Sequence, residues 1–305
     1  MGTPQGSILG PLLFSIYAND LPNSSKELDF SLYVDDCNSG MSDNNLLELV
    51  RKVNRELGHV NHWITSNRLT ANVLKLNHML FNDKGCHENY VVKLGNAVVP
   101  RVSHTRLLGI IVDDKLSWKF HVDTIASKIS QVCGLLYQIR NKLNKDCLKL
   151  LYYSLVYSHI VYGVCIWGGT RQKYLSVIVT AQKRAVRTML FVGRYEPTHE
   201  LFLDNNLLKF TFIYKYFLSI LIFKFVRFGY CSNVFTLTQR IANYNLRNTI
   251  NNVNIPDWRK SVCRMSPIYL GPLKWNLLEQ NVKLIQDINS FKRKCKLKML
   301  EEQRG

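Results

Sequence analysis

The sequence LDFSLYVDDCNSGM at residues 28–41 contains the pattern that decides the fold of the first half of the chain. Apolar residues occupy every second position from 28 to 32, which is the period of a half-buried β-strand. Two adjacent carboxylates, Asp35 and Asp36, come where this strand must reverse, and residues 37–41 can form the return strand. We therefore predict an antiparallel hairpin that carries an acidic pair at its turn.

The Asp35-Asp36 pair is the candidate chemical centre of the chain. Adjacent carboxylates at an exposed turn repel each other, and hard oxygen ligands of this kind select Mg²⁺, with Mn²⁺ as the alternative. Two such ions can activate a hydroxyl nucleophile and stabilise the leaving group in nucleotidyl transfer. The pair alone is a weak signal, because we expect Asp113-Asp114 in the same chain to be an ordinary solvated turn.

Segments on both sides of the hairpin complete an α+β half. A loop punctuated by Gly and Pro at residues 2–7 precedes a predicted helix at 8–17. Residues 46–64 form an amphipathic helix, since their apolar residues recur at steps of three and four. A two-residue turn is predicted at Gly95-Asn96. Further strands are predicted at 77–81, 91–94, 97–99 and 107–112. Together these elements predict an antiparallel sheet with helices on one face.

From residue 117 onward the pattern is helical. Apolar residues step by three or four from 118 to 143, and Asp146 is the expected cap of the next helix. The later helices are predicted at 146–167, 171–191, 201–228 and 284–300. A break near residues 193–197 is a candidate boundary. The predicted domains are 1–114 (α+β), 115–192 (helical), and 193–305 (helical and basic, of unknown role).

Charge and hydrophobicity limit the possible partners. The 305 residues contain 40 Lys and Arg against 22 Asp and Glu, a formal net charge of +18, which points to nucleic acid or an anionic membrane surface. Hydrophobic residues make up 47% of the chain, so wholesale disorder is excluded. The most apolar stretch, residues 207–228, is interrupted by four cations and is too short without them to cross a membrane. The start of the chain does not have the pattern of a secretory signal.

The eight cysteines contain no C-x-x-C pair and no spacing typical of a zinc site. We interpret them as reduced thiols of an intracellular protein, located in the nucleus, the cytoplasm or both. Four of them lie in apolar or helical contexts and are expected to be buried: Cys37, Cys133, Cys147 and Cys165.

The residues around the acidic pair resemble a known family. YVDD at 33–36, preceded by GTPQGSILGPLLF at 2–14 and YANDLP at 17–22, resembles the reverse transcriptases, and specifically the non-LTR (LINE-like, jockey-type) retrotransposon branch. Two further matches follow in the same order, residues 63–81 around Lys75 and HTRLLGIIVDDKLSW at 104–118. The resemblance is good over residues 1–185 and weaker beyond them.

The resemblance implies a fold, partners and roles for individual residues. The fold would be part of a polymerase palm, an antiparallel sheet with helices, followed by a helical thumb and a helical C-terminal region. The partners would be an RNA template, a DNA primer and deoxynucleoside triphosphates. Asp35 would ligate the catalytic metal with support from Asp36, and Lys75 would assist near the triphosphate, unless it is a solvated lysine. The residues implied to shape the template and nucleotide pocket are Pro4, Gln5, Gly6 and Tyr33.

The sequence also departs from the family pattern. The first catalytic aspartate and the fingers of the family precede the loop that contains Gln5, and nothing in this sequence precedes Met1. We therefore expect an N-terminally truncated RNA-directed DNA polymerase that is inactive alone. The alternative is a catalytically dead nucleic-acid-binding remnant, and a group II intron type maturase is a more distant one. Val34 stands where relatives mostly carry Ala, and Leu76 where a small hydroxyl residue is usual.

Overall fold

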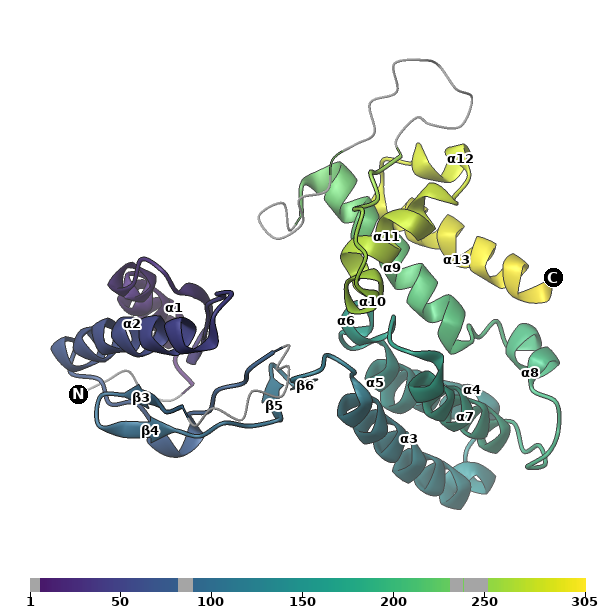
Figure 1. Ribbon diagram of the computed structural model, residues 1–305. Coiled ribbons are helices and arrows are strands. Elements are labelled where there is room, and N and C mark those ends of the chain that lie inside the picture. Colours follow the sequence, from purple (N-terminus) through teal and green to yellow (C-terminus); the bar gives the residue numbers. More distant parts are fainter. Residues whose placement is uncertain (1–5, 82–89, 231–237, 239–251) are drawn as a thin grey trace, which may run out of the picture. The chain divides into compact units, whose positions relative to one another are not determined.

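The computed structural model describes residues 6–81, 90–230, 238 and 252–305 (Figure 1). The chain divides into two compact units, residues 1–105 (unit 1) and residues 106–305 (unit 2). Pro4 and Gln5, on which part of the predicted pocket depends, lie outside the described residues. The chain combines helices with small two-stranded sheets, so the predicted α+β class is confirmed.

Unit 1 consists of short strands and two main helices. Its elements are α1 (Leu9–Ala18), the 3₁₀ turn η1 (Leu21–Ser24), β1 (Asp29–Tyr33), β2 (Asp36–Gly40), α2 (Leu46–Ser66), the 3₁₀ turn η2 (Val73–Lys75), β3 (Val92–Leu94) and β4 (Ala97–Val99). A further strand, β5 (His104–Leu107), spans the boundary between the units. The two hairpins, β1–β2 and β3–β4, are antiparallel and lie where the sequence predicts them.

The single antiparallel sheet expected for this half is not formed. The described strands make three separate two-stranded sheets, β1–β2, β3–β4 and β5–β6. The predicted strand at 77–81 is reduced to one isolated bridge between His78 and Arg101. Every residue of β2 is exposed, so this strand has only β1 beside it among the described residues and the hairpin is not extended into a larger sheet.

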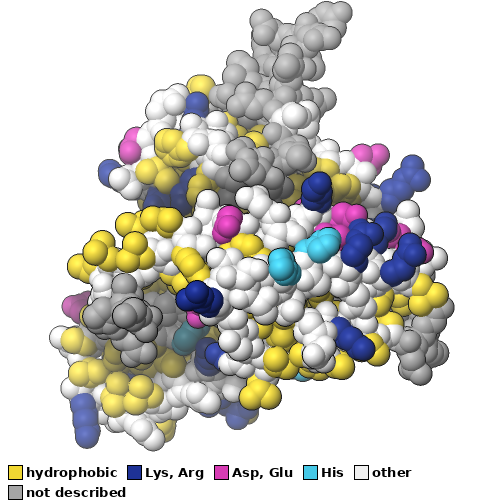
Figure 2. Space-filling view, turned by 90° about the vertical axis from the view of Figure 1, so that its left-hand side faces the viewer, with side chains coloured by type: hydrophobic (Ala, Val, Ile, Leu, Met, Phe, Trp, Pro, Cys, Tyr) yellow, Lys and Arg dark blue, Asp and Glu magenta, His cyan; other side chains and the backbone are white. Residues whose placement is uncertain are grey.

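The core of unit 1 is small. Its buried hydrophobic side chains are Leu21, Leu28, Val60, Val92, Leu94 and Val99. Residues of α2 pack against this cluster on the apolar stripe that the sequence predicts. In contrast, α1 leaves Leu12, Leu13 and Ile16 between 50% and 66% exposed. The exposure of these three residues means that a helical apolar pattern in α1 does not imply burial. Figure 2 shows that hydrophobic side chains are exposed on one face of the molecule.

Unit 2 is largely helical. It begins with β6 (Ile110–Asp113), and the following elements are α3 (Lys119–Ile139), the 3₁₀ turn η3 (Arg140–Lys142), α4 (Lys145–Leu151), the π-helical turn η4 (Tyr152–Tyr157), α5 (Ser158–Val161), α6 (Val164–Trp167), α7 (Gln172–Met189), α8 (His199–Asp204), α9 (Phe210–Phe228), α10 (Ser261–Arg264), α11 (Pro267–Asn276), α12 (Gln280–Lys283) and α13 (Ile288–Arg304). Helices α3 and α7 lie side by side, and α9 packs on α11 and α13 (Figure 1).

One hydrophobic core runs through unit 2. At its centre the ring of Trp167 stacks on Phe210 with 5.6 Å between ring centroids, and Phe223 stacks on Phe291 at 4.2 Å. This core includes buried residues both before and after position 193. Residues 115–192 and 193–305 therefore share a core, and the structure divides the chain at 105/106 rather than at the predicted positions. The division into three functional regions stays a prediction.

Two predicted elements differ near the start of unit 2. The single strand predicted at 107–112 is the pair β5 and β6, because Leu108 and Gly109 have φ values of 46° and 82° and reverse the chain. The hydroxyl of Tyr162 donates a hydrogen bond to the Leu108 carbonyl at 2.6 Å. The helix predicted at 146–167 ends before Gly163, whose φ is 61°. A Cβ at Gly163 would lie 2.4 Å from Cδ1 of Ile110.

Helix ends and cysteines give further corrections. The cap of α4 is Asn144, whose side chain accepts a hydrogen bond from the backbone N–H of Cys147 at 2.8 Å, and Asp146 lies one residue inside the helix. Cys133 is buried as expected and Cys165 is half-buried, but Cys37 and Cys147 are exposed. Cys37 belongs to β2, every residue of which is exposed.

Membrane insertion receives no support from the helices. Within the described part of the chain, none is both long enough and apolar enough to cross a bilayer.

Candidate metal-binding hairpin

The acidic pair lies at the end of the β1–β2 hairpin. Tyr33 pairs directly with Asp36, so Val34 and Asp35 form a two-residue turn. Residues opposite each other in an antiparallel pair point to the same face, which places the Tyr33 and Asp36 side chains on one face. Phe30 and Leu32 alternate to the other face, are partly buried and pack on the core of unit 1. The predicted hairpin is confirmed, but its turn is Val34-Asp35, one position earlier than the predicted Asp35-Asp36, and Asp36 is the first residue of β2.

The turn has an unusual backbone. Val34 has a φ of 54°, in the left-handed region that L-residues with branched Cβ atoms rarely adopt. Such a conformation costs about 1–2 kcal/mol in a non-glycine residue. It persists because the five paired positions from Asp29–Gly40 to Tyr33–Asp36 fix the strands on both sides. The position of Asp35 is thus set by a strained turn.

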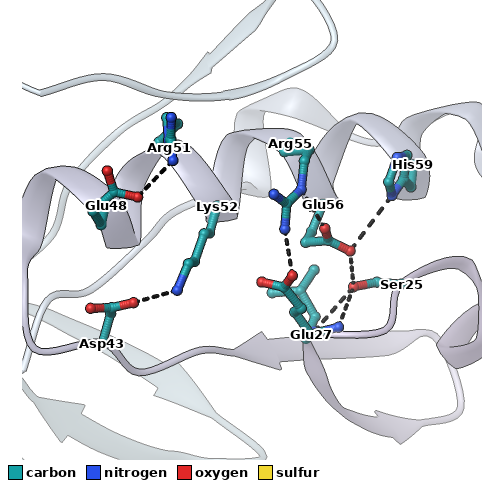
Figure 3. Close-up of polar contacts among 10 residues, drawn as sticks. Ser25, Glu27, Asp43, Glu48, Arg51, Lys52, Arg55, Glu56 and His59 are labelled. Carbon is teal, nitrogen blue, oxygen red and sulfur yellow. Dashed lines mark hydrogen bonds and ion pairs between the residues drawn. The ribbon is translucent and has the colours of Figure 1, made fainter.

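Both strands of the hairpin are tied at their base to α2 (Figure 3). Before β1, Glu27 accepts an ion pair from Arg55 at 2.5 Å. After β2, Asp43 accepts one from Lys52 at 2.6 Å. Arg55 and Lys52 lie three residues apart on α2, so they project from the same side of the helix. The base of the hairpin is fixed to a long helix while its acidic end projects away from the core.

A buried carboxylate strengthens this attachment. The Ser25 hydroxyl donates to Oε2 of Glu56 at 2.7 Å and accepts from the backbone N–H of Leu28 at 3.1 Å. Nε of Arg55 donates to Oε1 of Glu56 at 2.9 Å. The hydrogen bond from Ser25, followed by that from Arg55, lowers the pKa of Glu56 to about 2. Glu56 is therefore ionised at neutral pH although its side chain is buried.

These anchoring residues were not predicted from the sequence. Glu56 lies within the apolar stripe of α2, three residues after Val53 and four before Val60. An acidic residue on an apolar helix face is a signal of a buried, paired carboxylate, because burial of an unpaired charge is costly. That signal identifies Glu56 but not its partner, since Ser25 lies 31 positions away.

Asp35 and Asp36 differ from the anchoring carboxylates. Both are exposed, and neither carboxylate forms a hydrogen bond or ion pair with another described residue. Their carboxylate oxygens are the hard donors that Mg²⁺ and Mn²⁺ prefer. The donor set therefore fits a divalent cation. No group of three or more His, Cys, Asp or Glu side chains suited to a metal occurs in the part of the chain that the structure describes.

The second Asp pair has a different role from the one expected. Asp113 is 2% exposed, and its carboxylate accepts backbone N–H bonds from Lys115 at 3.2 Å, Ser117 at 2.9 Å and Trp118 at 2.8 Å. This side chain organises the turn into α3, so the pair is not a solvated turn. The structure distinguishes two Asp-Asp sequences that look alike: the Asp113 carboxylate accepts backbone hydrogen bonds, whereas the carboxylates of Asp35 and Asp36 both face solvent.

The remaining candidate residues are dispersed. Gly6 is exposed with a φ of 86°, which suits the loop before α1. Lys75 lies in η2 rather than on a strand, is exposed, and has no hydrogen bond or ion pair to the hairpin among the described residues. The structure thus brings Tyr33 beside Asp36, and leaves the roles of Gly6 and Lys75 as predictions.

The part of the chain that contains this hairpin is similar to a known protein family. Residues 1–112 match the family model "Reverse transcriptase (RNA-dependent DNA polymerase)", a span that includes the acidic turn and its anchors. This part of the chain is therefore similar to reverse transcriptases. The matched span covers unit 1 and most of β6 at the start of unit 2.

The relatives of this chain are proteins of non-LTR retrotransposons. The chain is 26% identical over 212 residues to the RNA-directed DNA polymerase from mobile element jockey of Drosophila melanogaster, covering 66% of the chain and 23% of that protein. It is 29% identical over 220 residues to the probable RNA-directed DNA polymerase from transposon BS of the same species, covering 68% and 24%. The chain spans about a quarter of the length of these relatives. No solved structure is significantly similar to it.

Proposed function

We propose that this chain supplies the metal-binding part of a polymerase palm, for transfer of deoxynucleotides to a primer 3′-end on an RNA template. The observation that carries the proposal is the pair Asp35 and Asp36, whose exposed carboxylates bind no other described residue, at the end of a hairpin that ion pairs fix to α2. A rigid support of this kind is what a metal site requires. The family match over residues 1–112 supports the same reaction.

The residues of the hairpin have distinct proposed roles. Asp35 and Asp36 hold a divalent cation, Mg²⁺ or Mn²⁺, which when bound activates the attacking hydroxyl and stabilises the leaving group. Tyr33, on the same face as Asp36, contacts the nucleotide or template. Gly6, with the preceding Pro4 and Gln5, shapes the same pocket, and Lys75 assists near the triphosphate.

The helical unit has a proposed role as the thumb. Its α7 carries Lys173, Lys183, Arg184 and Arg187, and the whole chain has a net charge of +18. Figure 2 shows Lys and Arg side chains scattered over one face of the molecule among hydrophobic and uncharged ones. Cationic surfaces of this kind bind nucleic-acid phosphates in a salt-dependent way. We propose that unit 2 contacts the template–primer duplex and that residues 193–305 extend that contact.

The 305-residue chain by itself is proposed to bind template and primer without extending the primer. Two-metal catalysis needs carboxylates that bridge both ions, and the resemblance places one of these on a segment outside these 305 residues. The alternative function is a nucleic-acid-binding remnant without any metal site. The net charge of +18 favours nucleic-acid binding in both cases, so metal binding distinguishes them.

Terbium luminescence tests the metal site directly. Tb³⁺ substitutes for hard divalent cations, and a tyrosine beside the bound ion sensitises its emission; Tyr33 is paired with Asp36. We expect Tb³⁺ emission that Mg²⁺ or Mn²⁺ suppresses and that Asp35→Asn with Asp36→Asn abolishes. The matched control is Asp114→Asn, from the other Asp pair, which should leave emission unchanged. Equal emission from all these proteins would support the remnant instead.

Primer extension tests the activity itself. The purified chain is incubated with an RNA template, an annealed DNA primer, deoxynucleotides and Mg²⁺. We expect no extension above that of the Asp35→Asn variant. Extension that depends on Asp35 would show that the chain alone is an active polymerase, whereas binding of the hybrid without metal-dependent emission would identify the remnant.

A further inference from the structure

A cavity of about 360 Å³ lies in unit 2, where α7 meets the junction between α8 and α9. Its polar lining comes from Gln182 and Lys183 of α7, Thr198 and His199 at the start of α8, and Lys209 and Thr211 at the start of α9. None of these residues belongs to the hairpin of unit 1 or to the proposed metal site. The cavity is therefore a separate feature of the helical unit.

The lining concentrates positive charge. Lys183 and Lys209 are both half-buried, and neither forms an ion pair with a described carboxylate. Nζ of Lys209 lies 2.6 Å from Nδ1 of His199. Burial and then the charge of Lys183 lower the pKa of Lys209, which Glu200 opposes only in part. The two ammonium groups thus face one cavity without a carboxylate in its lining.

The backbone beside this cavity is held in place by two buried glutamine side chains. Gln182 donates to the Leu208 carbonyl at 2.9 Å and accepts from the Phe210 N–H at 2.8 Å. Gln303 donates to the Leu207 carbonyl at 3.0 Å and accepts from the Lys209 N–H at 2.8 Å. These four bonds fix residues 207–210, so Lys209 is presented from a rigid segment rather than a free loop.

The cavity also offers hydrogen-bond donors of the kind that bind oxyanions. The hydroxyl-bearing Thr198 is 7% exposed and lines the cavity. The 19-residue helix α9 begins at the cavity wall, and its first turn contains no acidic residue. The positive end of a helix dipole adds to the field of the two lysines.

From these observations we propose that the cavity binds a phosphate group. The ammonium groups of Lys183 and Lys209 would hold the oxyanion, with Thr198 and His199 supplying hydrogen bonds. A phosphate bound here has two possible sources, the backbone of a nucleic-acid duplex or a free phosphate such as pyrophosphate. The proposal does not depend on the polymerase assignment, because it concerns binding in unit 2 alone.

The test compares two double variants of the full chain. The pocket variant carries Lys183→Gln and Lys209→Gln, and the control carries Lys142→Gln and Lys145→Gln, which remove the same charge from exposed positions of unit 2. Calorimetry measures binding of pyrophosphate, and fluorescence anisotropy measures binding of a short RNA–DNA hybrid, both at constant ionic strength. Circular dichroism checks that each variant is folded. A third double variant, Lys183→Arg with Lys209→Arg, keeps the two positive charges.

We expect the pocket variant to lose affinity by about ten-fold or more for at least one ligand, and the control by about two-fold or less. The arginine variant should retain binding. Loss for pyrophosphate alone identifies a free phosphate as the ligand, and loss that includes the hybrid identifies the nucleic-acid backbone. The proposal is overturned if the pocket and control variants lose equal affinity for both ligands, or if the pocket variant binds both like the unmodified chain.

Discussion

The hydroxyl of Ser25 donates a hydrogen bond to Oε2 of Glu56 at 2.7 Å, across 31 positions of sequence. Ser25 precedes β1, and Glu56 is buried in α2, so this bond joins the strand that leads to Asp35 to the helix that supports it. The buried carboxylate of Glu56 therefore helps to hold in place the strand that carries the exposed turn.

Removal of the Glu56 carboxylate should loosen the base of the hairpin. Glu56→Ala leaves Ser25 without its acceptor and Arg55 with one carboxylate fewer, so we expect unit 1 to lose about 1–3 kcal/mol of stability. Hydrogen exchange at the amides of β1 and β2 measures the effect. The control Arg51→Ala removes an exposed ion pair with Glu48 and should change exchange little. Equal exchange in both variants would contradict the anchoring role.

The same carboxylate predicts an acid-sensitive unit 1. Its pKa is lowered from an ordinary value of 4.5 to about 2, so the folded state binds the proton less readily than the unfolded state. The stabilisation is complete above pH 4.5 and is lost as the pH falls toward 2. Urea unfolding followed at the β1–β2 amides should show this loss in the native chain. Glu56→Gln should remove the pH dependence contributed by this group.

His121 predicts a second pH dependence, in unit 2. Its ring is 4% exposed, its Nδ1 accepts from the Ile111 N–H at 3.2 Å, and it lies edge-on to Trp167. Burial, with smaller contributions from the charges of Lys128 and Arg106, lowers its pKa to about 4. The unfolded state takes up the proton first, so stability falls as the pH drops from 6.5 to 4, by at most about 3 kcal/mol.

The measurement for His121 is an NMR titration of its ring protons alongside unfolding at several pH values. His121→Asn keeps an acceptor near the position of Nδ1 without a titrating group, so its stability should depend less on pH in this range. A titration of His121 near pH 6.5 in the folded chain would show that the ring is not held in its neutral form.

Relief of the turn strain should stabilise the hairpin. Val34 has a φ of 54°, which glycine adopts without steric cost, so Val34→Gly should raise hairpin stability by about 1 kcal/mol. The matched control is Val98→Gly, at an exposed position of β4 without positive φ, where the same change should lower stability by a similar amount. Hydrogen exchange at the two hairpins reports both effects. Destabilisation by Val34→Gly would show that the turn is not strained.

Asp113 should contribute far more to the stability of unit 2 than its neighbour Asp114. Asp113→Ala leaves three backbone N–H groups at the start of α3 without their acceptor, so we expect unit 2 to lose about 2–4 kcal/mol. Asp114→Ala removes a half-buried neighbour that accepts none of these bonds and should cost about 0.5 kcal/mol or less. Thermal unfolding measures the difference. Similar costs for both variants would contradict the capping role of Asp113.

The sequence by itself determined the local elements. Alternation at 28–32 and the acidic pair predict the β1–β2 hairpin, Gly95-Asn96 predicts the β3–β4 turn, and the stripe of residues 46–64 predicts α2. These features depend on neighbours a few positions apart, which a sequence pattern records. For the same reason the motif around Asp35 indicated the reverse transcriptase family before any contact was known.

Tertiary contacts decided where those elements begin and end. The strand predicted at 107–112 reverses at Leu108, where Tyr162 binds its carbonyl from 54 positions away. The helix predicted at 201–228 is interrupted before Phe210, where Gln182 and Gln303 take up the backbone groups of residues 207–210. In these places the backbone N–H and C=O groups bind distant side chains and do not continue the helix or the strand. Local sequence propensity contains no information on such partners. These hydrogen bonds join residues far apart in the chain, and for that reason only the folded structure reveals them.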